Sequence, residues 1–157
     1  MNANLEKLKQ IRLFLLKEIE PLTIEQLNKI PEGFNNNIIW NMAHLVASMQ
    51  ALCYKRAGLP LAIDEKYVSL YLANTKPSEF LSAKEMEEIK DHLIATIDIL
   101  QIDLDKNIFN NYTPSPNVLK LYKINLSTID DALDFLLYHD GYHTGSIMAL
   151  KRLVNNN

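Results

Sequence analysis

Cysteine, basic clusters and long apolar runs are the features that this 157-residue sequence has least of. The single cysteine, Cys53, cannot form an internal disulfide, which favours a reducing compartment. No apolar run approaches the roughly 20 residues that a membrane-spanning helix needs. The net charge is −3 and there is no basic block, so nothing attracts nucleic acid or an anionic membrane. The N-terminus, MNANLEKLKQIRLF, also lacks the layout of a signal peptide. These absences predict a cytoplasmic protein with neither a nucleic-acid nor a membrane partner.

Apolar residues make up 48% of the chain and charged residues 22%, which is ordinary for a globular protein with a buried core. The length is that of about one domain. We therefore expect residues 1–157 to form a single domain.

A helical spacing of apolar residues dominates the sequence and predicts four main helices, over 3–20, 36–56, 82–103 and 127–154. The first has Leu5, Leu8, Ile11, Leu15 and Ile19 on one stripe. Capping boxes begin a short turn at Thr23 with Gln26 and the third helix at Ser82 with Glu85.

Two long connections, 58–81 and 105–126, separate the last three helices. No strand alternation is convincing, although 118–126 (VLKLYKINL) has the composition of an extended segment. Four amphipathic helices predict an all-α four-helix bundle. The long connections allow a topology other than simple up-down-up-down, and connections of this length are often functional.

Two histidines interrupt the core-facing stripe of the last helix. Ala132, Leu136, His139, His143, Ser146 and Leu150 step by three or four residues, so they share one face. The second predicted helix has the same interruption, because its stripe of Asn37, Trp40, His44, Ala47 and Ala51 passes through a histidine. His44, His139 and His143 therefore converge if these two helices are neighbours.

Three neutral imidazoles with an open fourth position are the ligand set of catalytic zinc sites, and they also suit nickel, iron or copper. A bound metal would offset the cost of burying three polar rings. The alternative is that each histidine is a core residue that donates a hydrogen bond to a backbone carbonyl. The pattern alone leaves both interpretations open.

Other polar residues are weaker candidates. His92 lies beside the stripe of its helix and is expected at the flank or surface. Asp140 is turned off the histidine face, so we expect a solvated aspartate, with a role as acceptor for a ligand imidazole N–H as the alternative. Cys53 lies on the opposite side of its helix from His44 and is expected to be buried and structural. Tyrosines in the connections are candidates for lining a pocket or for ordinary packing: Tyr67, Tyr71 and Tyr112.

The segments NNNIIWNMAHLVASMQ and DALDFLLYHDGYHTGSIMALKRL resemble the DinB-like superfamily, which includes metal-dependent thiol transferases. LTIEQLNKIP extends the resemblance, which covers nearly the whole chain. It implies a four-helix bundle with a crossover connection, frequent homodimers, and one divalent metal (zinc, nickel, iron or manganese) on His44, His139 and His143. Gly145 matches the glycine after the last ligand, but Ser146 replaces the glutamine that often follows it.

Two classes of function follow. In the first, the protein is an enzyme: the metal's open position binds the sulfur of a small thiol cosubstrate and directs it at an electrophilic small molecule, or activates water for hydrolysis. In the second, it is a non-catalytic bundle, with metal-stabilised or purely structural histidines. An open position facing a solvent-connected pocket favours the enzyme, and a sealed site or a fourth protein ligand favours the structural role.

Overall fold

The computed structural model describes residues 1–155, and these residues contain helices and no strand. The helices follow one another in the order α1 (Ala3–Ile19), α2 (Ile24–Asn28), α3 (Ile38–Met49), the π-helix η1 (Gln50–Lys55), α4 (Glu65–Leu70), α5 (Ala83–Asp105), α6 (Pro116–Tyr122) and α7 (Ile129–Asn155). The all-α prediction is thus confirmed. No helix in this part of the chain is long and apolar enough to cross a bilayer.

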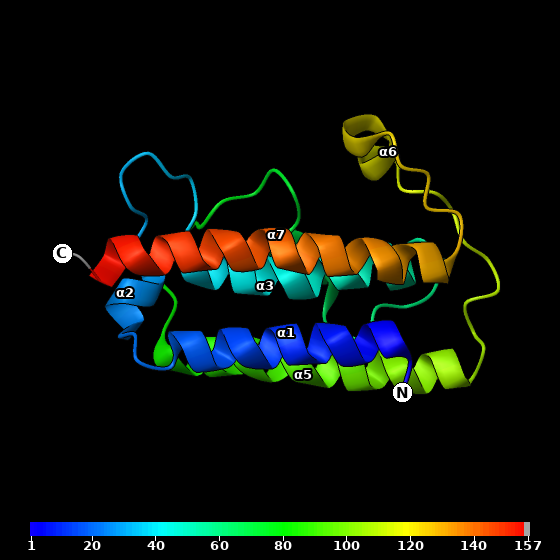
Figure 1. Cartoon of the computed structure of the whole chain (residues 1–157), viewed down its shortest axis with the longest axis horizontal. Coiled ribbons are helices and arrows are strands. Elements are labelled where there is room, and N and C mark those ends of the chain that lie inside the picture. The colour runs from blue at the N-terminus through cyan, green and yellow to red at the C-terminus, as the bar shows by residue number, and fades with distance from the viewer. Residues whose placement is uncertain (156–157) are drawn as a thin grey trace.

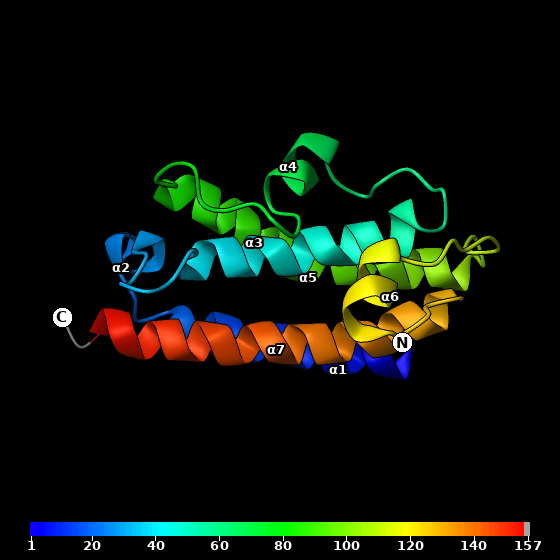
Figure 2. The ribbon, with the colours of Figure 1, turned by 90° about the horizontal axis from the view of Figure 1, so that it is seen from above.

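The four long segments pack around a common core (Figures 1 and 2). α1 packs against α5 and α7, and α3 packs against the same two helices, so α1 and α3 lie diagonally across the bundle. α1 and α7 run in one direction while α3 and α5 run in the other (Figure 1). The chain must therefore travel back along the bundle between η1 and α5, through α4. This is a bundle with a crossover, as the long connection suggested.

The capping signals of the sequence mark helix starts correctly. Thr23 and Gln26 form a reciprocal capping box at α2, and Ser82 and Glu85 form another at α5. Helix starts of this kind satisfy backbone N–H groups that have no partner inside the helix.

The second predicted helix is not α-helical throughout, because its last turn widens into η1. Residues 118–126, whose composition would also suit an extended segment, are helical in their first part, because 116–122 forms α6. Its start is a strong signal in retrospect, since the Ser115 side chain accepts from the N–H of Val118 and Pro116 occupies the first turn. The first connection contains a further short helix, α4.

α3 is the most deeply placed helix, and all of its residues are buried. Cys53, just after it, is fully buried in the core as predicted. On α1 the predicted stripe is right at four positions, but Ile11 is only partly buried and Arg12 takes its place at 0% exposure. A buried arginine needs partners for its charge.

Candidate metal centre

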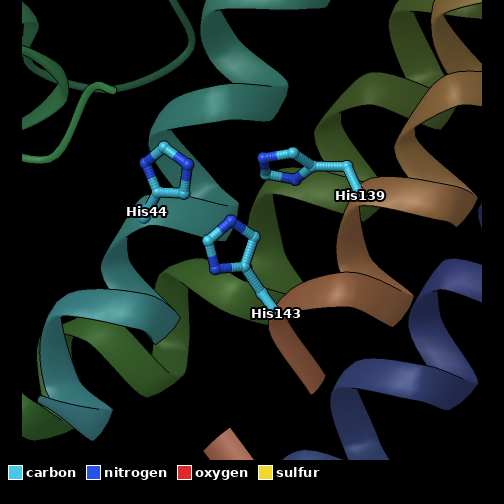
Figure 3. A group of neighbouring side chains, drawn as sticks. All are labelled: His44, His139 and His143. Carbon is cyan, nitrogen blue, oxygen red and sulfur yellow. The ribbon is translucent and has the colours of Figure 1, made fainter. Parts of the chain in front are cut away.

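His44 from α3 and His139 and His143 from α7 face one another (Figure 3). Their ring centroids are 5.2 Å apart for His44 and His139, and 4.6 Å for each of the other two pairs. One ring nitrogen of each residue lies within 4.8 Å of those of the other two. The convergence that the two stripes predicted is therefore present, because α3 and α7 are neighbours.

Burial keeps two of the rings neutral. His44 is 5% exposed and His143 is 8% exposed. Loss of hydration lowers the pKa of His44 to about 4 and, together with the neighbouring histidines, lowers the pKa of His143 to about 3. Neutral imidazole is the form that coordinates a metal.

The partners of His44 determine which of its nitrogens carries the proton. Its Nδ1 lies 2.5 Å from the carbonyl oxygen of Tyr71, which can only accept, so Nδ1 is protonated. Nε2 then has a free lone pair, and the Ser48 hydroxyl donates to it at 3.2 Å. Trp40 stacks on the ring with an interplanar angle of 9° and holds its plane. Nε2 is thus the nitrogen of His44 that is available to a ligand.

His143 is oriented in the same way by an amide. Its Nδ1 lies 2.8 Å from Oδ1 of Asn41. The Asn41 amide nitrogen donates to Oδ1 of Asn36 and to the carbonyl of Asn37, so its oxygen must be the atom that faces His143. Nδ1 of His143 is therefore a donor and Nε2 carries the lone pair.

His139 faces a carboxylate instead. Its Nδ1 lies 3.8 Å from Oδ1 of Asp140, which is too long for a hydrogen bond, and both atoms are buried without a hydrogen-bond partner. The expectation that Asp140 is solvated is wrong, since the residue is 0% exposed. All three histidines thus have an acceptor oxygen on their Nδ1 side, from Tyr71, Asn41 and Asp140.

Arg12 neutralises Asp140 and connects the bundle. Its Nε donates to Oδ2 of Asp140 at 2.9 Å, and both side chains are fully buried. Its two terminal nitrogens donate to the carbonyls of Leu93 at 3.1 Å and Leu45 at 3.2 Å. One side chain on α1 therefore contacts α3, α5 and α7. Burial alone would raise the pKa of the Asp140 carboxyl, but the Arg12 guanidinium holds that pKa below its usual range.

The three histidines line an open cavity of about 490 Å³. It extends along α3 and η1 to Lys55 and Arg56 and is covered by the 115–122 segment. Tyr122, Phe135 and Tyr138 give it an aromatic wall, with ring centroids 5.5 to 5.7 Å apart. A cavity of this size holds a small organic molecule.

The other sequence candidates lie outside this cavity. His92 is partly buried and contacts the Tyr67 ring edge-on at 5.2 Å, apart from the three histidines. Tyr71 lines a separate pocket of about 20 Å³, which has room for about one water molecule. The Tyr112 hydroxyl donates to the carbonyl of Leu52. Burial raises the pKa of the Cys53 thiol to about 12, so this thiol is unreactive at neutral pH.

Sequence reasoning missed the residues that support the histidines. Asn41 stands out in retrospect, because it is a polar residue in a mostly apolar helix and lies one turn before His44. Arg12 occupies a position on the core stripe of α1, between Leu8 and Leu15. An arginine in such a position signals a buried anionic partner.

The chain is a helical bundle with a crossover, and three histidines cluster on its second and last long helices, α3 and α7. These features place it in the class of helical-bundle proteins that carry a set of donors able to hold a divalent metal. The sequence profile of the DinB superfamily matches residues 8–147, and the chain belongs to that superfamily. A comparison with curated proteins returned no match.

Proposed function

We propose that the protein is a divalent-metal-dependent enzyme that transfers a low-molecular-weight thiol to an electrophilic small molecule, with His44, His139 and His143 as the metal ligands. One observation carries the proposal: three imidazoles, held by the fold, line an open cavity. Within residues 1–155, no cysteine or carboxylate joins them as a fourth donor. Three protein ligands and an open position are typical of catalytic rather than structural sites.

The surroundings of the histidines fit such a metal. Tyr71 and Asn41 hold the Nδ1 protons of His44 and His143, which leaves Nε2 for coordination. We assign the same role toward His139 to Asp140, whose Oδ1 has no hydrogen-bond partner. Acceptors behind ligand imidazoles fix the rings and make them more basic. A divalent ion bound there would supply Lewis acidity, which lowers the pKa of a bound thiol or water.

The chain's own groups then position the reactants. The thiol gives its proton to water, its sulfur forms a bond to the electrophilic carbon, and the leaving group departs with the electron pair of the bond that breaks and takes up a proton from water. The aromatic wall offers an apolar surface for the body of the substrate. The protein supplies no nucleophile of its own, since Cys53 is buried in the core and its thiol has a raised pKa. An external thiol is therefore required.

A hydrolase is the second candidate, and Ser48 is the observation that favours it. Its hydroxyl lines the cavity and contacts Nε2 of His44. Once that nitrogen coordinates a metal, the hydroxyl is free to donate to a substrate carbonyl. Hydrolysis of esters or amides would need metal and water but no thiol.

Metal analysis followed by a conjugation assay tests the proposal. The purified protein is assayed after chelation and after reloading with zinc, nickel, iron or manganese, with common cellular thiols and a panel of electrophiles. We expect conjugation only when both metal and thiol are present. Ester cleavage without thiol would favour the hydrolase. A protein that binds no divalent metal would refute both.

We also propose a homodimer and a cytoplasmic location. Phe14 and Leu13 on α1 are 46% and 41% exposed and form an adjacent apolar pair at the surface, which supports a second copy at this face. Light scattering should give twice the 18.0 kDa chain mass, and Phe14→Glu should reduce it to one chain. A monomeric mass for the unmodified chain would contradict the dimer. The cytoplasm suits the proposal because its thiols are kept reduced.

A further inference from the structure

Two cationic side chains, Lys55 and Arg56, line the cavity that the histidines reach, and no carboxylate lines it. Within the described residues neither cation is part of an ion pair. Arg56 donates one side-chain hydrogen bond, to the carbonyl of Pro114 at 3.3 Å, and the Lys55 amine has no hydrogen-bond or ion-pair partner among the described residues. In a chain of net charge −3 this is a local region of positive charge without a partner.

The π-helix brings these cations to the histidine side. In an α-helix a step of four residues turns about 40° past a full turn, so successive steps drift around the axis. A π-helix has more residues per turn, so a step of four residues falls short of a full turn and reverses this drift. His44, Ser48, Leu52 and Arg56 consequently all line one cavity.

The wall of the cavity that α6 and α7 form, across from α3 and η1, is apolar and aromatic. Tyr122 from α6 and Phe135 and Tyr138 from α7 contact one another through their rings. The cavity thus has cations at one end, the histidines at the other and apolar rings between them. A ligand with an apolar middle part would complement this lining.

We propose that Lys55 and Arg56 form an anion subsite that recognises a small molecule with an apolar body and an anionic oxygen acid, a carboxylate or phosphate ester, at one end. The reactive end of the same molecule lies at the three histidines. This subsite rests on the proposed function, since it gives the substrate class for the cavity at the metal centre.

The spacing of the helix sets the length of this molecule. Arg56 follows His44 by at most about 18 Å of helix rise, the value for an α-helix, because η1 is π-helical and rises less per residue. All helical side chains lean toward the N-terminus, but those of Lys55 and Arg56 are longer than that of His44, so their charges come back further and leave on the order of 10 Å to span. Inorganic phosphate alone is too short to use both ends.

Calorimetric titration with defined probes tests the subsite. The probes are 4-phenylbutyrate, its neutral amide, 4-phenylbutyl phosphate and inorganic phosphate, each added to metal-free and to zinc-loaded protein. We expect the acid to bind about 10-fold more tightly than the amide, and less tightly as salt concentration rises. Comparing the acid with the phosphate ester identifies the preferred oxyanion.

Lys55→Gln should weaken binding of the acid about 3-fold and Arg56→Gln about 10-fold, whereas Lys66→Gln, on α4 outside the cavity, should have no effect. The Arg56→Gln variant also loses the hydrogen bond to the carbonyl of Pro114, which could disturb the fold. Lys55→Gln removes no such bond and therefore tests the proposal by itself.

Equal affinity for the acid and the amide would overturn the subsite. Affinity for the acid that depends on zinc but not on Lys55 and Arg56 would also overturn it, because the carboxylate would then be a metal ligand. Binding that depends on both cations in metal-free protein supports the subsite even if no metal-dependent transfer is found. A functional metal centre without that dependence refutes the subsite and leaves the proposed function intact.

Discussion

Replacing Arg12 with methionine removes the guanidinium that neutralises Asp140 but keeps most of the length and apolar bulk of the side chain. Both residues of the pair are 0% exposed, so no water can replace the lost charge. Breaking a buried ion pair from one side costs about 3–5 kcal/mol. The carbonyls of Leu45 and Leu93 lose a donor as well, but they lie inside helices and keep their backbone partners. A melting temperature lower by roughly 10 °C is expected for a chain of this size.

The loss of unfolding free energy in Arg12→Met should depend on pH, and the pKa of Asp140 determines whether this loss grows or shrinks as pH rises. In the unmodified protein the folded-state pKa of Asp140 is lowered, so its contribution to stability is present above the unfolded pKa and is lost as pH falls through the folded value. Without Arg12, burial raises the folded pKa above the unfolded value. The variant then loses stability as pH rises, so its deficit is larger at pH 8 than at pH 5.

Urea unfolding of the metal-free protein, followed by circular dichroism, measures the effect in Arg12→Met, Asp140→Leu and the double variant. The double variant should be more stable than the sum of the two single losses predicts, by about 1–3 kcal/mol. Lys9→Met is the matched control, because Lys9 forms a partly exposed pair with Asp98 between α1 and α5 and should cost less than about 1 kcal/mol. Additive losses, or an Arg12→Met deficit no larger than the control's, would refute this account of the pair.

Metal titrations should show that His143→Ala abolishes tight binding whereas His92→Ala does not, and equal losses would show that His92 has been misjudged. Asp140→Asn should weaken metal affinity about 10–100-fold if its carboxylate orients His139, as competition with a chelator would measure; an unchanged affinity would count against that role. The metal-free protein should lose on the order of 5 kcal/mol of unfolding free energy between pH 7 and 4.5, because the unfolded chain protonates His44 and His143 near pH 6.5 while the folded chain does so near 4 and 3. A loss that is unchanged in His143→Ala would point to other groups. Conjugation activity should survive Cys53→Ser, and activity that disappears in this variant yet persists after chelation would make the protein's own thiol the nucleophile.

The spacing of apolar residues was enough to predict the helices and to place the three histidines on core-facing stripes, because a regular helix fixes which residues share a face. That these stripes meet depends on α3 and α7 being neighbours, which the spacing left as a condition. The spacing failed where regularity ends. Nothing in QALCYK signals a π-helix, since the wider turn depends on packing around it. Asp140 was misjudged because its burial depends on Arg12, which lies 128 positions earlier in the chain. The start of α6 at Ser115 and Pro116 was readable, but the segment 118–126 that follows it also has a composition that suits an extended chain.

The two sides of the cavity differ in how tightly they are packed against the bundle. Its histidine side belongs to the bundle core, whereas α6 keeps Val118 buried and leaves Leu119, Leu121 and Tyr122 between 42% and 71% exposed. Substitutions in this cover cost the bundle little, yet they change the surface that a ligand meets. The same fold can therefore vary the surface of this cavity through the exposed positions of residues 115–122 while the histidine cluster stays constant, which makes these positions well suited to evolutionary divergence and to engineering.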